Sequence, residues 1–178
     1  LENIGRSPSR MDYKKLDNLN GHSLRLTDDA ALVKDVAALL AHRTPPVTLA
    51  GKAGTRLLVA MPGLKERAKT LVELADSAEF LFSDGPRTLD AAAEKVLTAD
   101  ARAVLGKLVP ILEKGDWSTS ALEERTRAFA DAAGLKLGQA AQPIRAALTG
   151  RGTSPPIFAM LEVLGREESL ARLRAYAV

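Results

Sequence analysis

Apolar residues recur along this chain at intervals of three and four positions, which places them on one face of an α-helix. Leu32, Val36 and Leu40 show this spacing, and Pro45-Pro46 ends the helix that they predict. No segment alternates apolar and polar residues in the manner of a half-buried strand. In the first half we predict helices around 16–24, from the Thr27-Asp28-Asp29 cap to Pro45, over 52–61 and over about 64–82, the last two separated by Pro62-Gly63.

The second half carries clear start and stop signals for helices. Thr88 and Thr98 fit N-cap positions, and Ser120-Ala121-Leu122-Glu123 has the spacing of a capping box. Glycines at 134, 150 and 165 stand where three helices should end. We therefore predict helices over 89–97, 99–114, 120–133, 138–149, 157–164 and 167–177. The expected fold class is all-α.

A turn cluster, Ser83-Asp84-Gly85-Pro86, is the best internal boundary in the chain. It predicts two consecutive helical bundles, one over residues 1–84 and one over residues 87–178. No repeat at a fixed period is present, which argues against a solenoid.

Composition supports helices and narrows the chemistry. Among 178 residues, 46% are hydrophobic but only 4% aromatic, so the core must rest on Leu, Ala, Val and Ile. The net charge of +3 permits an anionic partner without proving one. The absence of cysteine excludes disulfides, thiolate zinc sites and cysteine nucleophiles. No apolar run reaches the ~18 residues of a membrane span, so no membrane partner is expected.

Nothing in the sequence predicts a catalytic or metal-binding residue. His22 and His42 stand far apart on separate predicted helices. Gly51-Lys52 resembles part of a phosphate loop, but position 46 is Pro, position 53 is Ala and no strand precedes it. The many carboxylates are expected on exposed helix surfaces, where pairing with arginines is their ordinary role, so they do not indicate catalysis. We expect no catalytic residue, no metal site and no cofactor in this chain.

Two stretches carry a specific resemblance. Residues 11–25 read MDYKKLDNLNGHSLR, and residues 136–150 read KLGQAAQPIRAALTG, followed by SPPIF at 154–158. The first is similar to the segment that follows the catalytic domain of bacterial-type glutamyl-tRNA synthetases, and the second resembles the anticodon-binding signature of that family. Three positions depart from the family pattern: Met11, Ser23 and Pro156. The resemblance covers essentially the whole chain.

The resemblance implies a class I aminoacyl-tRNA synthetase of the cytoplasm, a ligase of protein biosynthesis that joins glutamate to its tRNA with ATP and magnesium. Its catalytic motifs, H-x-G-H and K-[ML]-S-K, do not occur here, and the chain does not begin with Met. We therefore expect a piece of the C-terminal region that is inactive alone. The implied partner is tRNA(Glu), with tRNA(Gln) left open and no DNA.

Helical spacing indicates which side chains could meet an RNA loop. The helix over 138–149 should bury its Ala, Ile and Leu positions and leave Gly138, Gln142, Arg145 and Thr149 on the opposite stripe. Arg145 can bond a base edge or stack on its face, and Gln142 both donates and accepts. Pro143 inside this helix removes one backbone hydrogen bond.

The family resemblance adds residues from the following loop and from the first bundle. It implies that Arg145, Ser154, Pro155 and Ile157 meet anticodon bases. Arg67 corresponds to the reader of the third anticodon position, although Arg56 or Lys69 could fill that role. Arg151 of the loop is a further candidate for contact with the anticodon, and Lys136 and Thr149 are candidates for supporting RNA contacts.

Other interpretations of the same residues are structural. An exposed arginine is often only a solvated charge, and Trp117 is expected to anchor the core rather than stack on a base. The alternative function is a helical protein-interaction module, or a regulatory tRNA-binding module, without a synthetase partner domain.

Overall fold

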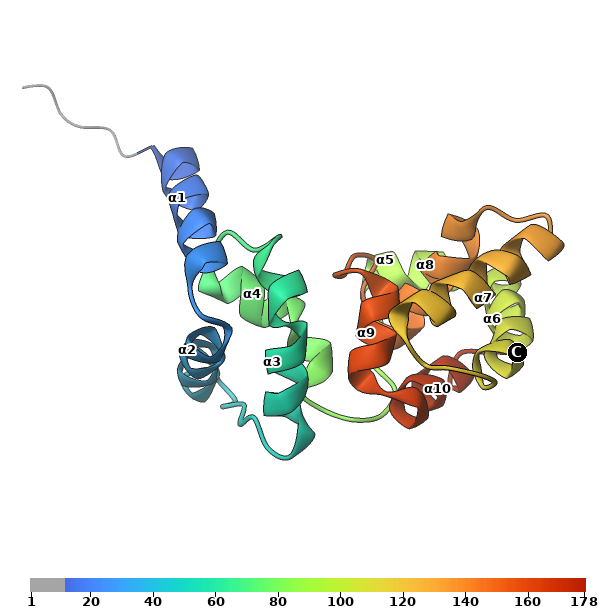
Figure 1. Ribbon diagram of the computed structural model, residues 1–178. Coiled ribbons are helices and arrows are strands. Elements are labelled where there is room, and N and C mark those ends of the chain that lie inside the picture. The colour runs from blue at the N-terminus through green and yellow to red at the C-terminus, as the bar shows by residue number, and fades with distance from the viewer. Residues whose placement is uncertain (1–11) are drawn as a thin grey trace, which may run out of the picture.

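The computed structural model describes residues 12–178, so Met11 and the rest of the first eleven residues lie outside the described range. Within that range the chain forms ten α-helices and one 3₁₀ turn and no β-strand, which confirms the predicted all-α class (Figure 1). The elements are α1 (Tyr13–Leu26), α2 (Asp29–Ala41), α3 (Lys52–Lys65), α4 (Leu71–Ser77), η1 (Glu79–Leu81), α5 (Ala91–Val96), α6 (Ala99–Leu112), α7 (Thr119–Ala132), α8 (Leu137–Thr149), α9 (Ile157–Leu164) and α10 (Arg166–Arg174).

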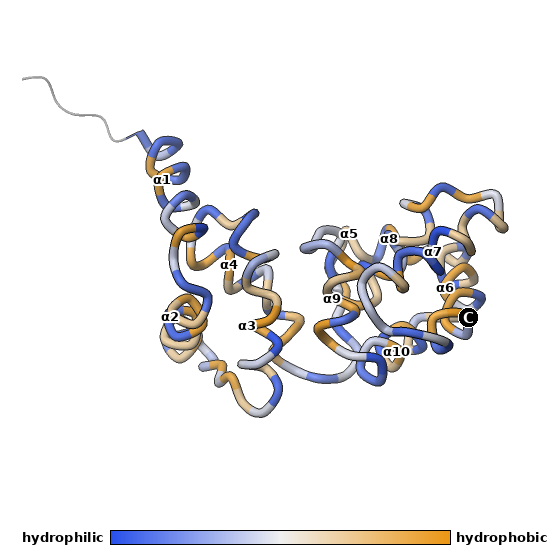
Figure 2. The backbone as a smooth tube through the Cα atoms, in the orientation of Figure 1, coloured by the Kyte–Doolittle hydropathy of each residue, from blue (hydrophilic) through white to orange (hydrophobic). Residues whose placement is uncertain are grey.

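The helices form two groups that lie side by side (Figure 1). The N-terminal group consists of α1–α4 and η1, and the C-terminal group consists of α5–α10; the segment 82–90 joins them and contains no helix. Helices α3 and α9 pack against each other across the two groups. In Figure 2 the helices carry both apolar and polar stretches, as expected where one face is buried and the other is solvated.

The N-terminal group is built on leucine packing between α2 and its neighbours. Asp28 accepts a hydrogen bond from the backbone N–H of Ala31 at 3.0 Å and so caps α2. Leu32, Val36 and Leu40, at the predicted spacing, are buried on the face that meets α3 and α4. The apolar periodicity of the sequence therefore identified this core face correctly.

The predicted break at Pro62-Gly63 is wrong, because α3 continues through Pro62 to Lys65. Met61 and Leu64 are buried in the same turn, and their packing holds the helix where proline removes one hydrogen bond. The chain leaves the helix later, at 66–70. There Thr70 accepts from the N–H of Glu73 at 3.1 Å, and the Glu73 carboxylate accepts from the N–H of Lys69 at 2.8 Å.

These two bonds start a new helix, so the single helix predicted over 64–82 is instead α4 followed by η1. The sequence carried the signal, since Thr70-Leu71-Val72-Glu73 has the spacing of a capping box.

Helix starts in the C-terminal group agree with the sequence at some positions and not at others. Thr98 caps α6 as predicted, by accepting from the N–H of Ala101 at 3.3 Å. Helix α5 begins later than predicted, because Asp90 rather than Thr88 accepts from the N–H of Ala93 at 2.6 Å.

The capping box predicted at Ser120 does not form. Helix α7 begins at Thr119, whose backbone N–H donates to the carboxylate of Glu162 on α9 at 2.7 Å. A side chain 43 residues away therefore serves as the cap, which no local pattern could reveal.

Helix α8 is the centre of the C-terminal group and packs against α5, α6, α7, α9 and α10. Ala140, Ile144 and Ala147 are buried, as the spacing predicted, and Pro143 is buried inside the helix. Gly150 ends α8 with a φ of 72°, which confirms the predicted stop, since this left-handed conformation favours glycine.

Two buried arginines hold the groups together. Arg172 of α10 is fully buried and donates to the carbonyl oxygens of Phe80 (2.9 Å), Ser83 (2.7 Å) and Leu148 (2.8 Å). Arg56 of α3 forms an ion pair with Asp84 at 2.5 Å. Because these bonds connect the joining segment to helices of both groups, they fix how the groups sit relative to each other. None of the helices in residues 12–178 is long and apolar enough to span a lipid bilayer.

Candidate functional site

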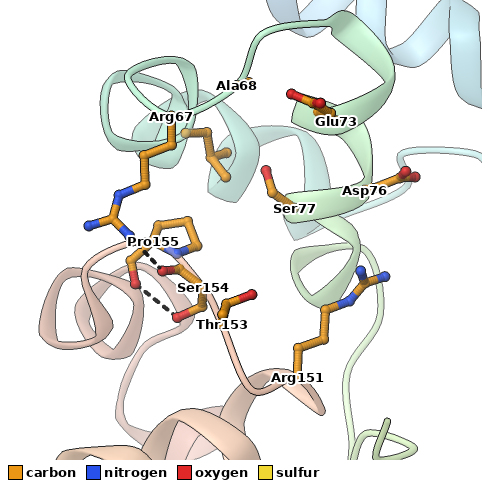
Figure 3. Close-up of a pocket in the computed structure, with 10 residues that line it drawn as sticks. Arg67, Ala68, Glu73, Asp76, Ser77, Arg151, Thr153, Ser154 and Pro155 are labelled. Carbon is orange, nitrogen blue, oxygen red and sulfur yellow. Dashed lines mark hydrogen bonds between the residues drawn. The ribbon is translucent and has the colours of Figure 1, made fainter. Parts of the chain in front are cut away.

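A groove of about 320 Å³ lies where the two groups meet (Figure 3). One wall is formed by the end of α3 and by α4, with Arg67, Glu73 and Asp76 among its residues. The other wall is the loop 151–155, which connects α8 to α9. We call this feature the central groove; it lies beside the α8–α9 loop that the sequence singled out.

Two arginines from different groups converge on one residue at the edge of the groove. Nη1 of Arg145, on α8, donates to the carbonyl oxygens of Ser154 (3.0 Å) and Pro155 (3.2 Å). Nη1 of Arg67, just after α3, donates to the same Ser154 carbonyl at 3.2 Å, a bond that Figure 3 shows. The Ser154 hydroxyl donates to the Pro155 carbonyl at 2.8 Å. The fold thus brings Arg67 to Ser154, which lies 87 residues later in the sequence and is also bonded to Arg145.

Neither of these guanidinium groups is neutralised by a carboxylate of the described residues. Among residues 12–178, no Asp or Glu oxygen lies within 4.0 Å of the charged nitrogens of Arg67 or Arg145. Burial of the half-buried Arg145, and then the positive charge of Arg67, lower the pKa of Arg145. A ligand that offers hydrogen-bond acceptors or negative charge would therefore be stabilised at this edge.

Arg151 also lines the groove, but its charge is compensated. Its guanidinium forms an ion pair with Glu79 of η1, across the junction between the two groups. Of the sequence candidates at the groove, Arg151 is thus the one that already has an anionic partner in the described residues.

The three candidates for contact with the third anticodon base differ in where they lie relative to the central groove. Arg67 lines the central groove. Arg56 is buried and bonded to Asp84 and to the Leu164 carbonyl, so it serves the junction instead. Lys69 is exposed and does not line the groove.

Gln142 and Lys136 lie on the accessible side of α8. Gln142 is exposed one turn before Arg145, on the same face of the helix. Lys136 is exposed at the N-cap of α8, about nine residues or ~13 Å before Arg145 along the helix. These positions leave Gln142 close enough to share a ligand with Arg145, while Lys136 would meet a more distant part of it.

Two sequence candidates, Thr149 and Ile157, are buried. Thr149 is only 4% exposed, and its hydroxyl donates to the Arg145 carbonyl (2.8 Å) and accepts from the Arg151 N–H (3.2 Å). Ile157 is also 4% exposed and packs into the core. Thr149 therefore stabilises the end of α8, and the prediction that it lies on the exposed stripe of this helix is wrong. Contact of Thr149 and Ile157 with RNA stays a prediction.

Prolines account for the apolar surface beside Ser154. Pro155, another sequence candidate, is also buried, although it contributes to the lining of the central groove. Pro156 is exposed, and its Cδ lies 4.0 Å from the position of a Cβ built on Gly63. The departure from the family pattern at 156 therefore adds an exposed ring next to α3.

Sequence reasoning missed the acidic wall of the groove. Glu73, Asp76 and Glu79 follow each other at intervals of three along α4 and η1. Glu73 and Asp76 line the groove, and Glu79 reaches it through Arg151. The spacing was visible in the sequence, but only the packing of α4 against the α8–α9 loop gives it significance.

The residues expected to be structural have structural surroundings. Trp117 packs against the core, and its Nε1–H donates to the Leu161 carbonyl at 3.0 Å, which agrees with its predicted anchoring role. The guanidinium of Arg166 lies 5.4 Å from the centre of its ring. Residues 12–178 contain no group of three or more His, Cys, Asp or Glu side chains that could hold a metal ion.

Comparison with known proteins places this geometry in a family. Residues 30–177 match the model of the anticodon binding domain. The chain is 54% identical to glutamate–tRNA ligase 1 of Beijerinckia indica, over 99% of this chain and 38% of that protein. It is also 54% identical to glutamate–tRNA ligase 2 of Rhodospirillum centenum, over 97% of this chain and 37% of that protein.

A solved structure shares the fold of this chain. A solved glutamate tRNA ligase from Elizabethkingia meningosepticum superposes with a TM-score of 0.76 at 22% identity, over 97% of this chain and 34% of that one. This chain thus spans less than two fifths of the length of the curated relatives that it matches. The family match covers most of the chain, and the chain belongs to the anticodon-binding domain family.

Proposed function

We propose that this chain binds tRNA(Glu) through its anticodon loop, as the tRNA-reading part of a glutamate–tRNA ligase. The observation that carries the proposal is the pair of guanidinium groups, Arg67 and Arg145, that meet on Ser154 at the edge of the central groove. Unpaired loops are the usual targets of sequence-specific RNA recognition, because their bases can be splayed out and read along their edges.

Each residue has a distinct task in this proposal. Arg145 and Gln142 lie on one face of α8 and offer a base edge both donors and an acceptor. Arg67 approaches the same site from the N-terminal group and reads the third anticodon base. Ser154 holds both guanidinium groups in place through its carbonyl oxygen. Lys136, exposed at the far end of α8, would contact RNA phosphate and set register rather than sequence.

The two groups of helices suggest a division of labour. We infer that residues 1–84 form a connecting module on the side of the tRNA stem and that residues 87–178 form the anticodon-binding bundle. The turn cluster at 83–86 separates them, and Arg67 lets the first module contribute to reading by the second.

We expect the ligase reaction itself to take place on another domain of the full-length protein. In the full-length ligase, which we expect in the cytoplasm, ATP and magnesium would activate glutamate for transfer to tRNA on a separate catalytic domain. This chain would supply docking and selectivity, and by itself it would not charge tRNA. Whether tRNA(Gln) is also accepted depends on how strictly Arg67 reads its base.

Substitution of Arg145 tests the proposal directly. Arg145→Ala should weaken binding of tRNA(Glu) by on the order of 1–3 kcal/mol, roughly 5- to 150-fold, as expected for a bidentate or stacked base contact. Binding should be measured for tRNA(Glu) and for the same tRNA with only its anticodon exchanged. The ratio of the two affinities should fall toward one, because a base contact is lost.

A matched control separates base reading from general attraction. Lys136→Ala, at an exposed cation of the same helix, should weaken both tRNAs alike and leave their ratio unchanged. Arg145→Ala that changes neither affinity nor ratio would remove Arg145 from the reading site. Affinity that does not fall with salt would favour the protein-interaction alternative, since phosphate contacts release counterions.

A further inference from the structure

Arg67 and Arg151 line the groove, and Arg145 bonds to Ser154 at its edge; these three arginines have two kinds of partner. Arg67 and Arg145 donate to neutral carbonyl oxygens, whereas Arg151 forms an ion pair with Glu79. Both members of the pair are accessible to solvent, with the side chains of Arg151 and Glu79 41% and 47% exposed. Ion pairs this exposed are individually weak, so an incoming anion can replace the carboxylate.

Glu79 is the acidic residue of this wall that pairs with Arg151. Its neighbours on the acidic wall are engaged elsewhere: Asp76 forms an ion pair with Arg43, and the Glu73 carboxylate accepts from the N–H of Lys69 at 2.8 Å. The sequence separation of 72 residues shows that the pair of Glu79 and Arg151 is a contact of the tertiary fold. Figure 3 shows Arg151 below α4, apart from the cluster around Ser154.

The Arg151 guanidinium therefore has the charge and exposure that suit a phosphate group. A base reader must present its donors in one orientation, as Arg145 does through its bonds to Ser154 and Pro155. A phosphate contact needs only a cation that can move to the anion. Arg151 meets the second requirement, since its partner is an exposed carboxylate that carries the same charge as a phosphate oxygen.

We infer that the Arg151–Glu79 pair is a phosphate-exchange site: in the absence of RNA the Glu79 carboxylate occupies Arg151, and an RNA phosphate takes its place on binding. The inference rests on the proposed function and assigns Arg151 to the RNA backbone instead of to a base. Glu79 is then an internal competitor that lowers the sequence-independent part of RNA affinity. Its release on binding leaves an uncompensated carboxylate that attracts a cation and so reduces the net release of counterions.

Substitutions that remove the charge of one member of the pair test this inference. Glu79→Gln keeps the shape of the side chain but frees Arg151. It should tighten binding of tRNA(Glu) and of the anticodon-exchanged tRNA by the same factor, about 2- to 5-fold at low salt, the range of a weak exposed ion pair. The slope of log affinity against log salt should become steeper by up to about 0.7, the value for one single-strand phosphate contact.

The control is an ion pair with similar exposure on another helix. Glu123 of α7 pairs with Arg127, with side chains 43% and 54% exposed. Glu123→Gln changes the net charge by the same amount as Glu79→Gln, so it measures the effect of net charge alone. It should alter affinity much less than Glu79→Gln if the competition is local to Arg151.

A double variant identifies the group on which Glu79 acts. Arg151→Gln should weaken both tRNAs equally, and adding Glu79→Gln to it should produce no further tightening beyond that of the Glu123→Gln control. Tightening by Glu79→Gln that persists without Arg151, or that merely equals the control, would overturn the inference. A change of the anticodon ratio in Arg151→Gln would also overturn it, because Arg151 would then read a base.

The outcomes also separate this inference from the proposed function. If the unaltered chain binds tRNA without distinguishing anticodons and Arg145→Ala has no effect, the proposed function fails. If the unaltered chain distinguishes anticodons but Glu79→Gln behaves like Glu123→Gln, only the phosphate-exchange site fails.

Discussion

Arg172 has the largest fully buried side chain in residues 12–178, and its replacement by Met should strongly destabilise the fold. The side chain has no exposed surface, and its ion-pair partner Glu168 is only 12% exposed. The Glu168 carboxylate also accepts from the N–H of Gly85 at 2.9 Å. Loss of the guanidinium would leave a shielded carboxylate with one remaining hydrogen-bond donor among these residues.

The magnitude follows from the groups that lose their partner. Arg172→Met leaves the carbonyl oxygens of Phe80, Ser83 and Leu148 without the donor that they now share. Breaking a buried ion pair by removing one partner costs about 3–5 kcal/mol, because the other charge stays behind. Met replaces much of the apolar volume, so we expect a loss of about 3–5 kcal/mol rather than the larger sum of single bonds. This corresponds to a fall in Tm of about 6–20 °C for a chain of this size.

Equilibrium unfolding in urea, followed by circular dichroism, measures this loss. Arg127→Met is the control, since its i,i+4 partner Glu123 is exposed and the variant should change stability by no more than about 0.5 kcal/mol. Adding Glu168→Gln to Arg172→Met should restore part of the stability, because it removes the uncompensated charge. The reasoning is refuted if Arg172→Met costs no more than Arg127→Met.

Three further predictions concern a close approach, a cap and acid stability. Gly106→Ala should destabilise the chain by about 1–3 kcal/mol, because a Cβ there would overlap the carbonyl oxygen of Val178. Gly54→Ala, with open space around it in α3, should instead stabilise the chain by about 0.5–1 kcal/mol, and urea midpoints compare the two variants. Thr70→Ala should cost about 1 kcal/mol in the same assay, since it removes the N-cap of α4. The hydrogen bond from Arg56 lowers the pKa of Asp84 below its ordinary 3.8, so this pair stabilises the fold above that pH and is lost as the pH falls through the lowered pKa. Asp84→Asn should flatten the fall in Tm as the pH drops below 3.8, and an unchanged acid profile would contradict this assignment.

Several features follow from local sequence alone. Thr98 caps α6, Gly150 ends α8, and Leu32 and Val36 face the core, all as predicted. In each case the deciding atoms lie within four or five residues of one another, so the signal and the structure occupy the same stretch of chain. The residues over 136–150 also indicate the family, because their order and spacing form a long and specific motif, and they lie within the matched residues 30–177.

The site depended on contacts that local patterns do not contain. Arg145 and Arg67 were both named from the sequence, but only the packing of the two groups brings them to Ser154. Thr149 was placed on the exposed stripe, and it is buried because the joining segment and α5 cover the end of α8. Helical spacing predicts which side chains share a face, but it cannot predict what covers that face.

The same reason explains the features that were missed. Glu162 caps α7 from α9, Pro62 is tolerated because its neighbours are buried, and Glu79 meets Arg151 across 72 residues. The sequence by itself determined the helices, most of their ends and the family. The tertiary structure decided which charges are buried, paired or left open, because the surroundings of a side chain are set by helices that are distant along the chain.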